Sequence, residues 1–126
     1  MQNNNSKPKT DLRQRAYCYA VDMIRFIDGL EQKDFSIQVI SKQLLRSATS
    51  IGANIIEAQA GSSKRDFTNF FAYSLKSSNE SKFWLGLLKD TGKASGEKLN
   101  YMLQETSEIA NILGSSILTL KGKRRI

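Results

Sequence analysis

The sequence has no histidine, one cysteine (Cys18) and one proline (Pro8) among its 126 residues. Without histidine, the usual Cys/His zinc sites and the catalytic triads with an imidazole base are excluded. One cysteine cannot form an intrachain disulfide, so nothing indicates an oxidising compartment. Because the single proline precedes the first periodic segment, the rest of the chain is free to form long helices.

Long apolar runs are also lacking. No run approaches the roughly 20 residues that cross a membrane, and residues 1–9 lack the apolar segment of a signal peptide. We therefore expect a cytoplasmic protein that does not bind membranes. The length suits one domain, and 40% hydrophobic with 25% charged residues is typical of a globular protein.

Apolar residues recur every three or four positions in four segments, which predicts an all-α fold. The predicted helices cover about 11–28, 37–60, 64–91 and 97–120. Short connections make successive helices antiparallel, so we expect an up-down-up-down four-helix bundle. This bundle would occupy residues 11–120, between a disordered lead-in at 1–10 and a basic tail at 121–126.

Residues at the predicted helix ends agree with this assignment. A glycine follows each segment, where a left-handed C-cap favours that residue; these are Gly29, Gly61, Gly92 and Gly122. Serine precedes three segments and is expected to cap their N-termini; these are Ser36, Ser63 and Ser95.

The second predicted helix carries two stripes. One is apolar: Ile37, Ile40, Leu44, Ala48, Ile51, Ile55 and Ala58. Beside it runs a small polar stripe: Ser47, Ser50, Asn54 and Glu57. Two stripes predict a helix packed on two sides. We interpret the polar stripe as a structural hydrogen-bond network that fixes packing and register.

The third predicted helix has serines in its apolar phase. We expect its core face to be Phe67, Phe70, Ser74, Ser77, Ser81, Trp84 and Leu88. The serines would face the polar stripe across a close antiparallel contact, eased by Gly52 and Gly86. Phe71 and Phe83 lie off this phase and are expected at a subunit interface, while Cys18 is expected to be buried.

Glu57 is the one acidic residue of the small polar stripe, so a catalytic role has to be considered for it. A lone carboxylate without histidine or a second acid in phase makes a catalytic acid improbable, so we predict no enzyme activity. Lys64, Arg65 or Arg46 could neutralise it if it is buried. No phosphate-binding glycine loop and no metal-ligand spacing is present, so we expect no cofactor, metal or small-molecule substrate.

The net charge of +7 is unevenly spread. The excess lies in residues 1–25, 61–95 and 121–126, and the other segments are slightly acidic. The candidate nucleic-acid contacts are Arg46, Lys64, Arg65, Lys121, Lys123, Arg124 and Arg125. Two interpretations stay open, namely contact with phosphates and simple solubility.

Two motifs resemble a known family. Residues 46–57 read Arg-Ser-Ala-x-Ser-Ile-x-x-Asn-Ile-x-Glu, and residues 63–67 read Ser-Lys-Arg-Asp-Phe. A looser match follows at Ser74, Leu75, Ser77 and Glu80. The pattern resembles the 23S rRNA-intervening-sequence proteins, whose superfamily includes the accessory variability determinant of diversity-generating retroelements. The resemblance covers about residues 12–120.

The resemblance implies a four-helix bundle that assembles into a barrel-shaped homopentamer with a basic surface or channel. It also implies, for the retroelement branch, a nucleic-acid-binding partner of a reverse transcriptase. We therefore expect a non-enzymatic homo-oligomer that binds RNA or DNA with little sequence specificity. The alternative is a scaffold that recruits a protein partner such as a reverse transcriptase, with the charge serving solubility.

Overall fold

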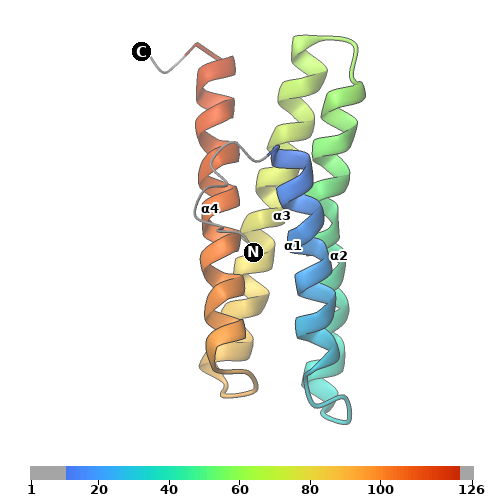
Figure 1. Cartoon of the computed structure of the whole chain (residues 1–126), viewed down its shortest axis with the longest axis vertical. Coiled ribbons are helices and arrows are strands. Elements are labelled where there is room, and N and C mark those ends of the chain that lie inside the picture. Colours follow the sequence, from blue (N-terminus) through green and yellow to red (C-terminus); the bar gives the residue numbers. More distant parts are fainter. Residues whose placement is uncertain (1–10, 123–126) are drawn as a thin grey trace, which may run out of the picture.

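Four antiparallel helices make up the computed structural model, which describes residues 11–122. They are α1 (Leu12–Asp28), α2 (Phe35–Ala60), α3 (Lys64–Asp90) and α4 (Glu97–Leu120). Successive helices run in opposite directions (Figure 1), and neighbours pack in the order α1, α2, α3, α4 and back to α1. The predicted all-α bundle is confirmed. The predicted lead-in at 1–10 and the tail beyond Gly122 lie outside the described residues.

The helix N-termini differ in part from prediction. Ser63 caps α3 as expected, because its hydroxyl accepts a backbone N–H at 3.1 Å. Ser36 is not a cap: α2 begins at Phe35, two residues before the predicted start, and the Asp34 carboxylate accepts the Ile37 backbone N–H instead. Ser95 is not a cap either, since Gly96 with φ 94° precedes α4. Short carboxylates cap as well as serine does, which explains the displacement in α2.

Only two of the four C-terminal glycines adopt the left-handed conformation that we predicted. Gly92 and Gly122 have φ values of 72° and 71°. Gly29 and Gly61 have φ values of −86° and −68°, which any residue can adopt. Gly29 therefore has no need of glycine, since an added Cβ would meet its nearest atom at 3.6 Å, whereas at Gly61 it would crowd the Asp66 Cβ at 3.2 Å and the Ala58 carbonyl oxygen at 3.3 Å.

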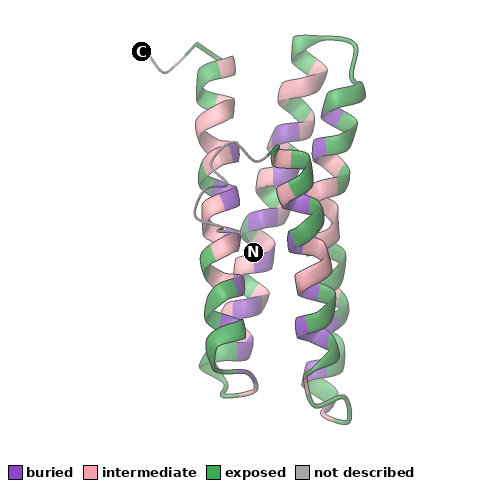
Figure 2. Cartoon of the chain, in the orientation of Figure 1, coloured by how far each residue is buried: buried purple, intermediate pink, exposed green. Residues whose placement is uncertain are grey.

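The buried residues line the interior of the bundle (Figure 2). On α2 the predicted apolar stripe is buried except for half-buried Ile40. On α3 the predicted core positions Ser74, Ser81 and Leu88 are buried, whereas the other three buried residues, Phe71, Ser78 and Leu85, each lie one position later than predicted. Phe70, Ser77 and Trp84 are half-buried. Serine and aromatic side chains occur on adjacent positions of α3, so its sequence admits two core phases.

Two single-residue expectations are wrong, because each side chain lies on a different face of its helix from the one predicted. Phe71 is 5% exposed and stacks on Phe67 with ring centroids 4.5 Å apart, so it is a core residue. Cys18 is exposed, because α1 turns Ala16 and Tyr19 toward the core and Cys18 falls on the other side of the helix. Phe83 is 57% exposed and stays available to a partner.

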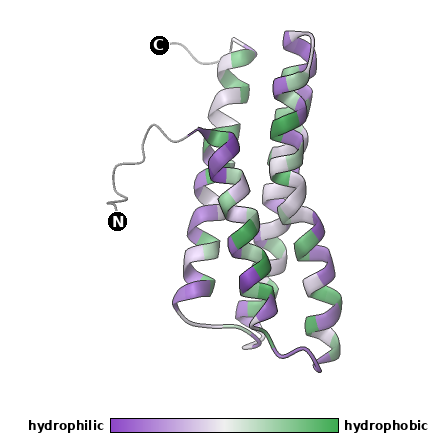
Figure 3. Ribbon diagram, turned by 45° about the vertical axis from the view of Figure 1, so that its right-hand side comes forward, coloured by the Kyte–Doolittle hydropathy of each residue, from purple (hydrophilic) through white to green (hydrophobic). Residues whose placement is uncertain are grey.

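The bundle is open at one end. Because α1 has 17 residues and the other helices have 24 to 27, α2, α3 and α4 extend beyond its N-terminus (Figure 1). A groove of about 510 Å³ remains between α3 and α4; Leu12, Phe67, Phe71, Ile112 and Leu120 line it, with three small polar residues. Figure 3 shows that hydrophobic and hydrophilic residues are interspersed along the helices that form this end.

Gly52 and Gly86 do not serve the α2–α3 contact as predicted. A Cβ at Gly52 would lie 3.5 Å from the Ala16 Cβ, so Gly52 faces α1. A Cβ at Gly86 would meet nothing within 4 Å. Only Gly52 therefore lies where a side chain larger than alanine would push two helices apart.

We predict that Gly86→Ala stabilises the protein by about 1 kcal/mol, because alanine has the higher helix propensity and the site has room. Gly52→Ala should be neutral to stabilising, since 3.5 Å is an ordinary contact distance. Urea unfolding of both variants would measure this. The matched pair Gly86→Leu and Gly52→Leu separates the sites, because only the second should destabilise. A destabilising Gly86→Ala would show that this position is covered.

Candidate nucleic-acid interface

Serine hydroxyls join α2 to α3 along a buried seam. The Ser47 and Ser81 hydroxyls lie 2.8 Å apart, and the Ser74 hydroxyl donates to the Ile51 carbonyl of α2 at 2.9 Å. All three serines are 0% exposed. Each hydroxyl is small enough to let the helices approach and polar enough to bond across them. The predicted serine contact between the two helices is therefore present, though with Ser78 rather than Ser77 in the buried set.

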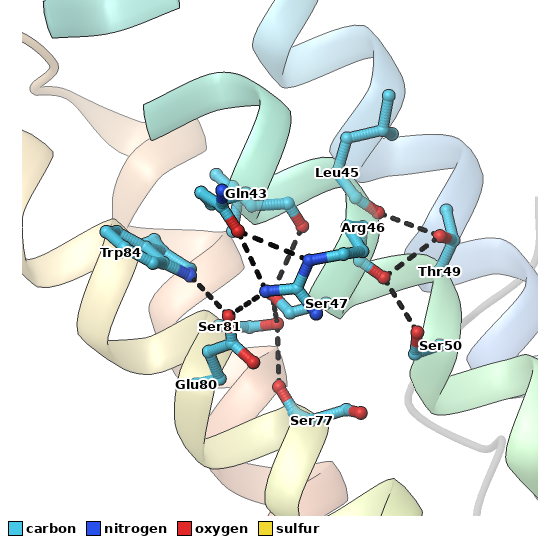
Figure 4. A network of polar contacts seen from close by, with 11 residues as sticks. Gln43, Leu45, Arg46, Ser47, Thr49, Ser50, Ser77, Glu80, Ser81 and Trp84 are labelled. Atoms are coloured by element: carbon cyan, nitrogen blue, oxygen red, sulfur yellow. Dashed lines mark hydrogen bonds and ion pairs between the residues drawn. The ribbon is translucent and has the colours of Figure 1, made fainter. Parts of the chain in front are cut away.

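Above this seam, Arg46 of α2 forms an ion pair with Glu80 of α3 (Figure 4). The guanidinium also donates to the Gln43 side-chain oxygen at 2.9 Å. The Trp84 indole N–H donates to the same Glu80 carboxylate at 2.9 Å. Arg46 is thus held on the surface by one acid and one amide, and a phosphate would compete with Glu80 for it.

The hydrogen bond from Trp84 and the nearby Arg46 guanidinium hold the pKa of Glu80 below its ordinary value. Charge-assisted hydrogen bonds to a carboxylate favour its ionised form. Glu80 therefore stays ionised at neutral pH and links the two helices by charge as well as by packing.

The rest of the predicted polar stripe bonds within its own helix. The Ser50 hydroxyl donates to the Arg46 carbonyl at 2.8 Å, and the Asn54 amide donates to the Ser50 carbonyl at 2.9 Å. Glu57 is exposed. Of the four stripe residues, only Ser47 has a hydrogen bond to another helix among those described. Glu57 has no need of the buried counter-ion that we considered for it.

Three of the predicted cations gather at the open end of the bundle. Lys64 and Arg65 begin α3, and Lys121 follows the last residue of α4. Figure 1 places the start of α3 and the end of α4 at the same end of the molecule. All three side chains are exposed, and none forms an ion pair within residues 11–122. Lys123, Arg124 and Arg125 lie outside the described residues.

Four cations form ion pairs within residues 11–122: Arg13, Arg15, Arg46 and Lys93. Arg15 of α1 forms ion pairs with Glu105 and Glu108 of α4 at 2.7 and 2.6 Å, and the hydrogen bond to Glu105 raises its pKa. The Lys93 ammonium contacts Asp34 at 2.7 Å. Such pairs contribute little to the field outside the protein. Lys64, Arg65 and Lys121 have no such pair among the described residues, and the same holds for exposed cations elsewhere on the bundle, such as Arg25, Lys76 and Lys89.

The comparisons with known proteins decide the family. The sequence pattern of the family described as "23S rRNA-intervening sequence protein" matches residues 9–115. The chain belongs to this family. A crystal structure of a protein with unknown function from the S23 ribosomal protein family of Bacteroides thetaiotaomicron is similar. The two sequences are 38% identical, and the two structures superpose with a TM-score of 0.78. The match covers 85% of this chain and 98% of the Bacteroides chain. Among curated proteins, none matches.

Two other kinds of site are absent from residues 11–122. No group of three or more Cys, Asp or Glu side chains there is placed to hold a metal ion. In the same residues, no helix is both long and apolar enough to span a membrane.

Two members of the Arg46 network, Glu80 and Trp84, were absent from the predicted site. Their spacing of four residues places both on one face of α3, which is the signal that was available. What the spacing does not show is which α2 residue faces them. The pairing with Arg46 depends on the register of α2 against α3, and the Ser47–Ser81 contact sets that register one residue away.

We predict that Glu80→Gln destabilises the protein at pH 7 and that its effect disappears in acid. The folded-state pKa of Glu80 is lowered, so its contribution is present above the unfolded pKa and is lost as the pH falls through the folded pKa. Urea titrations at several pH values would measure this, and the fluorescence of Trp84, the single tryptophan, would report locally. The exposed Glu57→Gln is the control. An equal loss at every pH would mean that the carboxylate charge is irrelevant.

Proposed function

We propose that this protein is a non-enzymatic, cytoplasmic homo-oligomer that binds RNA or DNA through its basic surface with little sequence specificity. The observation that carries the proposal is the group of exposed, unpaired cations at the open end. Lys64 and Lys121 are far apart in sequence yet lie at one end of the bundle. In the sequence, Lys123, Arg124 and Arg125 follow soon after Lys121.

Contact with phosphates suits this arrangement better than base recognition does. Long lysine and arginine side chains at helix ends can reach phosphates. Base recognition needs instead a helix or a strand that enters a groove of the nucleic acid. The contribution of the lysine and arginine side chains is electrostatic, so affinity should fall steeply with salt. Assembly would multiply the effect, because each copy brings the same cations to one particle.

The assembly that we propose is a homopentamer, as the family resemblance implies. Its molar mass by light scattering would be five times the 14.2 kDa of one chain. A monomeric mass at micromolar concentration would contradict this part of the proposal and leave nucleic-acid binding to be judged separately.

We predict that the double variant Lys64→Ala/Arg65→Ala binds labelled RNA and DNA more weakly, and with a salt dependence lower by about two in the log–log slope. The matched control is Arg25→Ala/Lys98→Ala, which removes one arginine and one lysine from exposed positions at the other end of the bundle. Titrations at several salt concentrations would compare the two. Equal losses would mean that net charge, rather than this end, governs binding. Absence of binding by the parent protein at low salt would refute the proposal.

A second candidate is a scaffold that recruits a protein partner such as a reverse transcriptase. Tyr73 and Phe83 favour it, since these α3 side chains are 50% and 57% exposed and aromatic residues are enriched in protein interfaces. Co-purification that depends on Phe83 but not on Lys64 would support this candidate over the first.

A further inference from the structure

Two adjoining hollows lie at the end of the bundle where the α1–α2 and α3–α4 connections meet, opposite the open end (Figure 1). The helix hollow, of about 190 Å³, lies between α1 and α4 and is lined by Asp22, Arg25, Phe26, Lys98, Tyr101 and Met102. The loop hollow, of about 340 Å³, is formed largely by the connections, residues 29–31 and 92–95. Arg25, Phe26 and Lys98 line both, so the hollows are two halves of one site.

The helix hollow has an apolar floor and an aromatic rim. Phe26 and Met102 line it although they are 6% and 2% exposed, so they form its floor. Tyr101 is 49% exposed, which leaves its ring free to pack on a ligand. The Tyr101 hydroxyl donates to the Asp22 carboxylate of α1 at 3.4 Å. A flat aromatic ring suits this space, because it can stack on the tyrosine and cover the apolar floor.

The loop hollow is held in shape by contacts within the protein. The Lys93 ammonium of the α3–α4 connection contacts the carboxylate of Asp34, the last residue of the α1–α2 connection, at 2.7 Å. The Lys93 and Ala94 backbone N–H groups both donate to the Leu88 carbonyl, at 2.9 and 3.1 Å. The two connections are therefore fixed side by side. A preformed hollow loses little conformational entropy when a ligand binds.

Arg25 and Lys98 supply cations where the two hollows meet. They belong to different helices, both are exposed, and neither forms an ion pair within residues 11–122. An acid also lines each hollow, Asp22 in one and Glu31 in the other. Both carboxylates already accept a hydrogen bond, Asp22 from the α4 hydroxyl and Glu31 from a backbone N–H at 2.9 Å. The two cations are therefore the charged groups left to bind a ligand, which should be an anion.

The chemistry of these donors favours a phosphate. An arginine offers a planar fork of donors and a lysine a compact charge, and the two together can neutralise a doubly charged group. Ser95 is exposed and lines the loop hollow, so its hydroxyl can donate to the same group. The combined size of the hollows lies within the range of about 300 to 1,000 Å³ that is typical of small-molecule sites.

We propose that the two hollows form a binding site for a nucleoside monophosphate, with the base in the helix hollow against Tyr101 and the phosphate at Arg25 and Lys98. No glycine-loop motif marks this site in the sequence, because its groups come from separate segments that only the fold brings together. The inference goes beyond the proposed binding of RNA or DNA. It concerns the other end of the bundle, and a polymer held by the cations of the open end needs none of these residues.

The test is a titration with adenosine monophosphate, followed by calorimetry and by the amide NMR signals of Gly29 and Gly92, which line the loop hollow. We expect binding that shifts both signals. Adenosine and inorganic phosphate should each bind at least about tenfold more weakly, because each fills one half of the site. Adenosine or phosphate binding as tightly as the nucleotide would overturn the inference. So would the absence of nucleotide binding at millimolar concentration.

Variants at exposed positions check each half of the site. Arg25→Ala/Lys98→Ala should raise the Kd for adenosine monophosphate at least about tenfold, because two charged donors are lost. The matched control, Lys64→Ala/Arg65→Ala, removes the same residue types at the open end and should leave this Kd unchanged. Tyr101→Leu should weaken binding, whereas Tyr101→Phe keeps the ring and should bind like the parent protein. Equal losses in the two double variants, or equal binding by the two Tyr101 variants, would contradict the inference.

The same double variants separate this inference from the proposed function. Arg25→Ala/Lys98→Ala should keep the parent affinity for labelled RNA and DNA while it loses the nucleotide, and Lys64→Ala/Arg65→Ala should do the reverse. Binding of nucleic acid without binding of the nucleotide overturns this inference alone. Binding of the nucleotide without binding of nucleic acid overturns the proposed function alone.

Discussion

The close contact between α2 and α3 is the constraint on which the rest of the structure depends. Buried serines make it possible: Ser47 meets Ser81, and Ser74 bonds a carbonyl of the opposite helix. Larger apolar side chains would fill the same space but would keep the backbones apart and set no register. Hydroxyls that bond across the seam accept one alignment only. The pairs on the surface above it, including Arg46 with Glu80, follow from that alignment.

The bundle divides its surface by electrostatics. Ion pairs between helices, such as Arg15 with Glu105 and Lys93 with Asp34, neutralise cations along the sides and at one end. At the other end, where α3 starts and α4 stops, Lys64, Arg65 and Lys121 are exposed and form no ion pair within residues 11–122.

The sequence was sufficient to predict the number, the approximate limits and the direction of the helices, because periodicity and short turns are local properties. It was also sufficient to predict that serines join α2 to α3. The phase of α3 was not predictable, since Phe70 and Phe71, or Ser77 and Ser78, fit a core equally well in isolation. For the candidate site, composition showed which cations to consider, whereas only the fold shows that Arg46 is engaged by Glu80.

The shortness of α1 has a consequence for local stability. Where α1 is absent, Phe67 and Leu120 border a groove instead of a fourth helix, so that end has fewer contacts to lose on opening. Amide hydrogens there should exchange through small local fluctuations, while those near Leu44 and Ile51 exchange only when the bundle unfolds. The same adaptable end holds Lys64 and Lys121. In the function proposed above, these cations would therefore act from the part of the bundle that rearranges at the lowest cost.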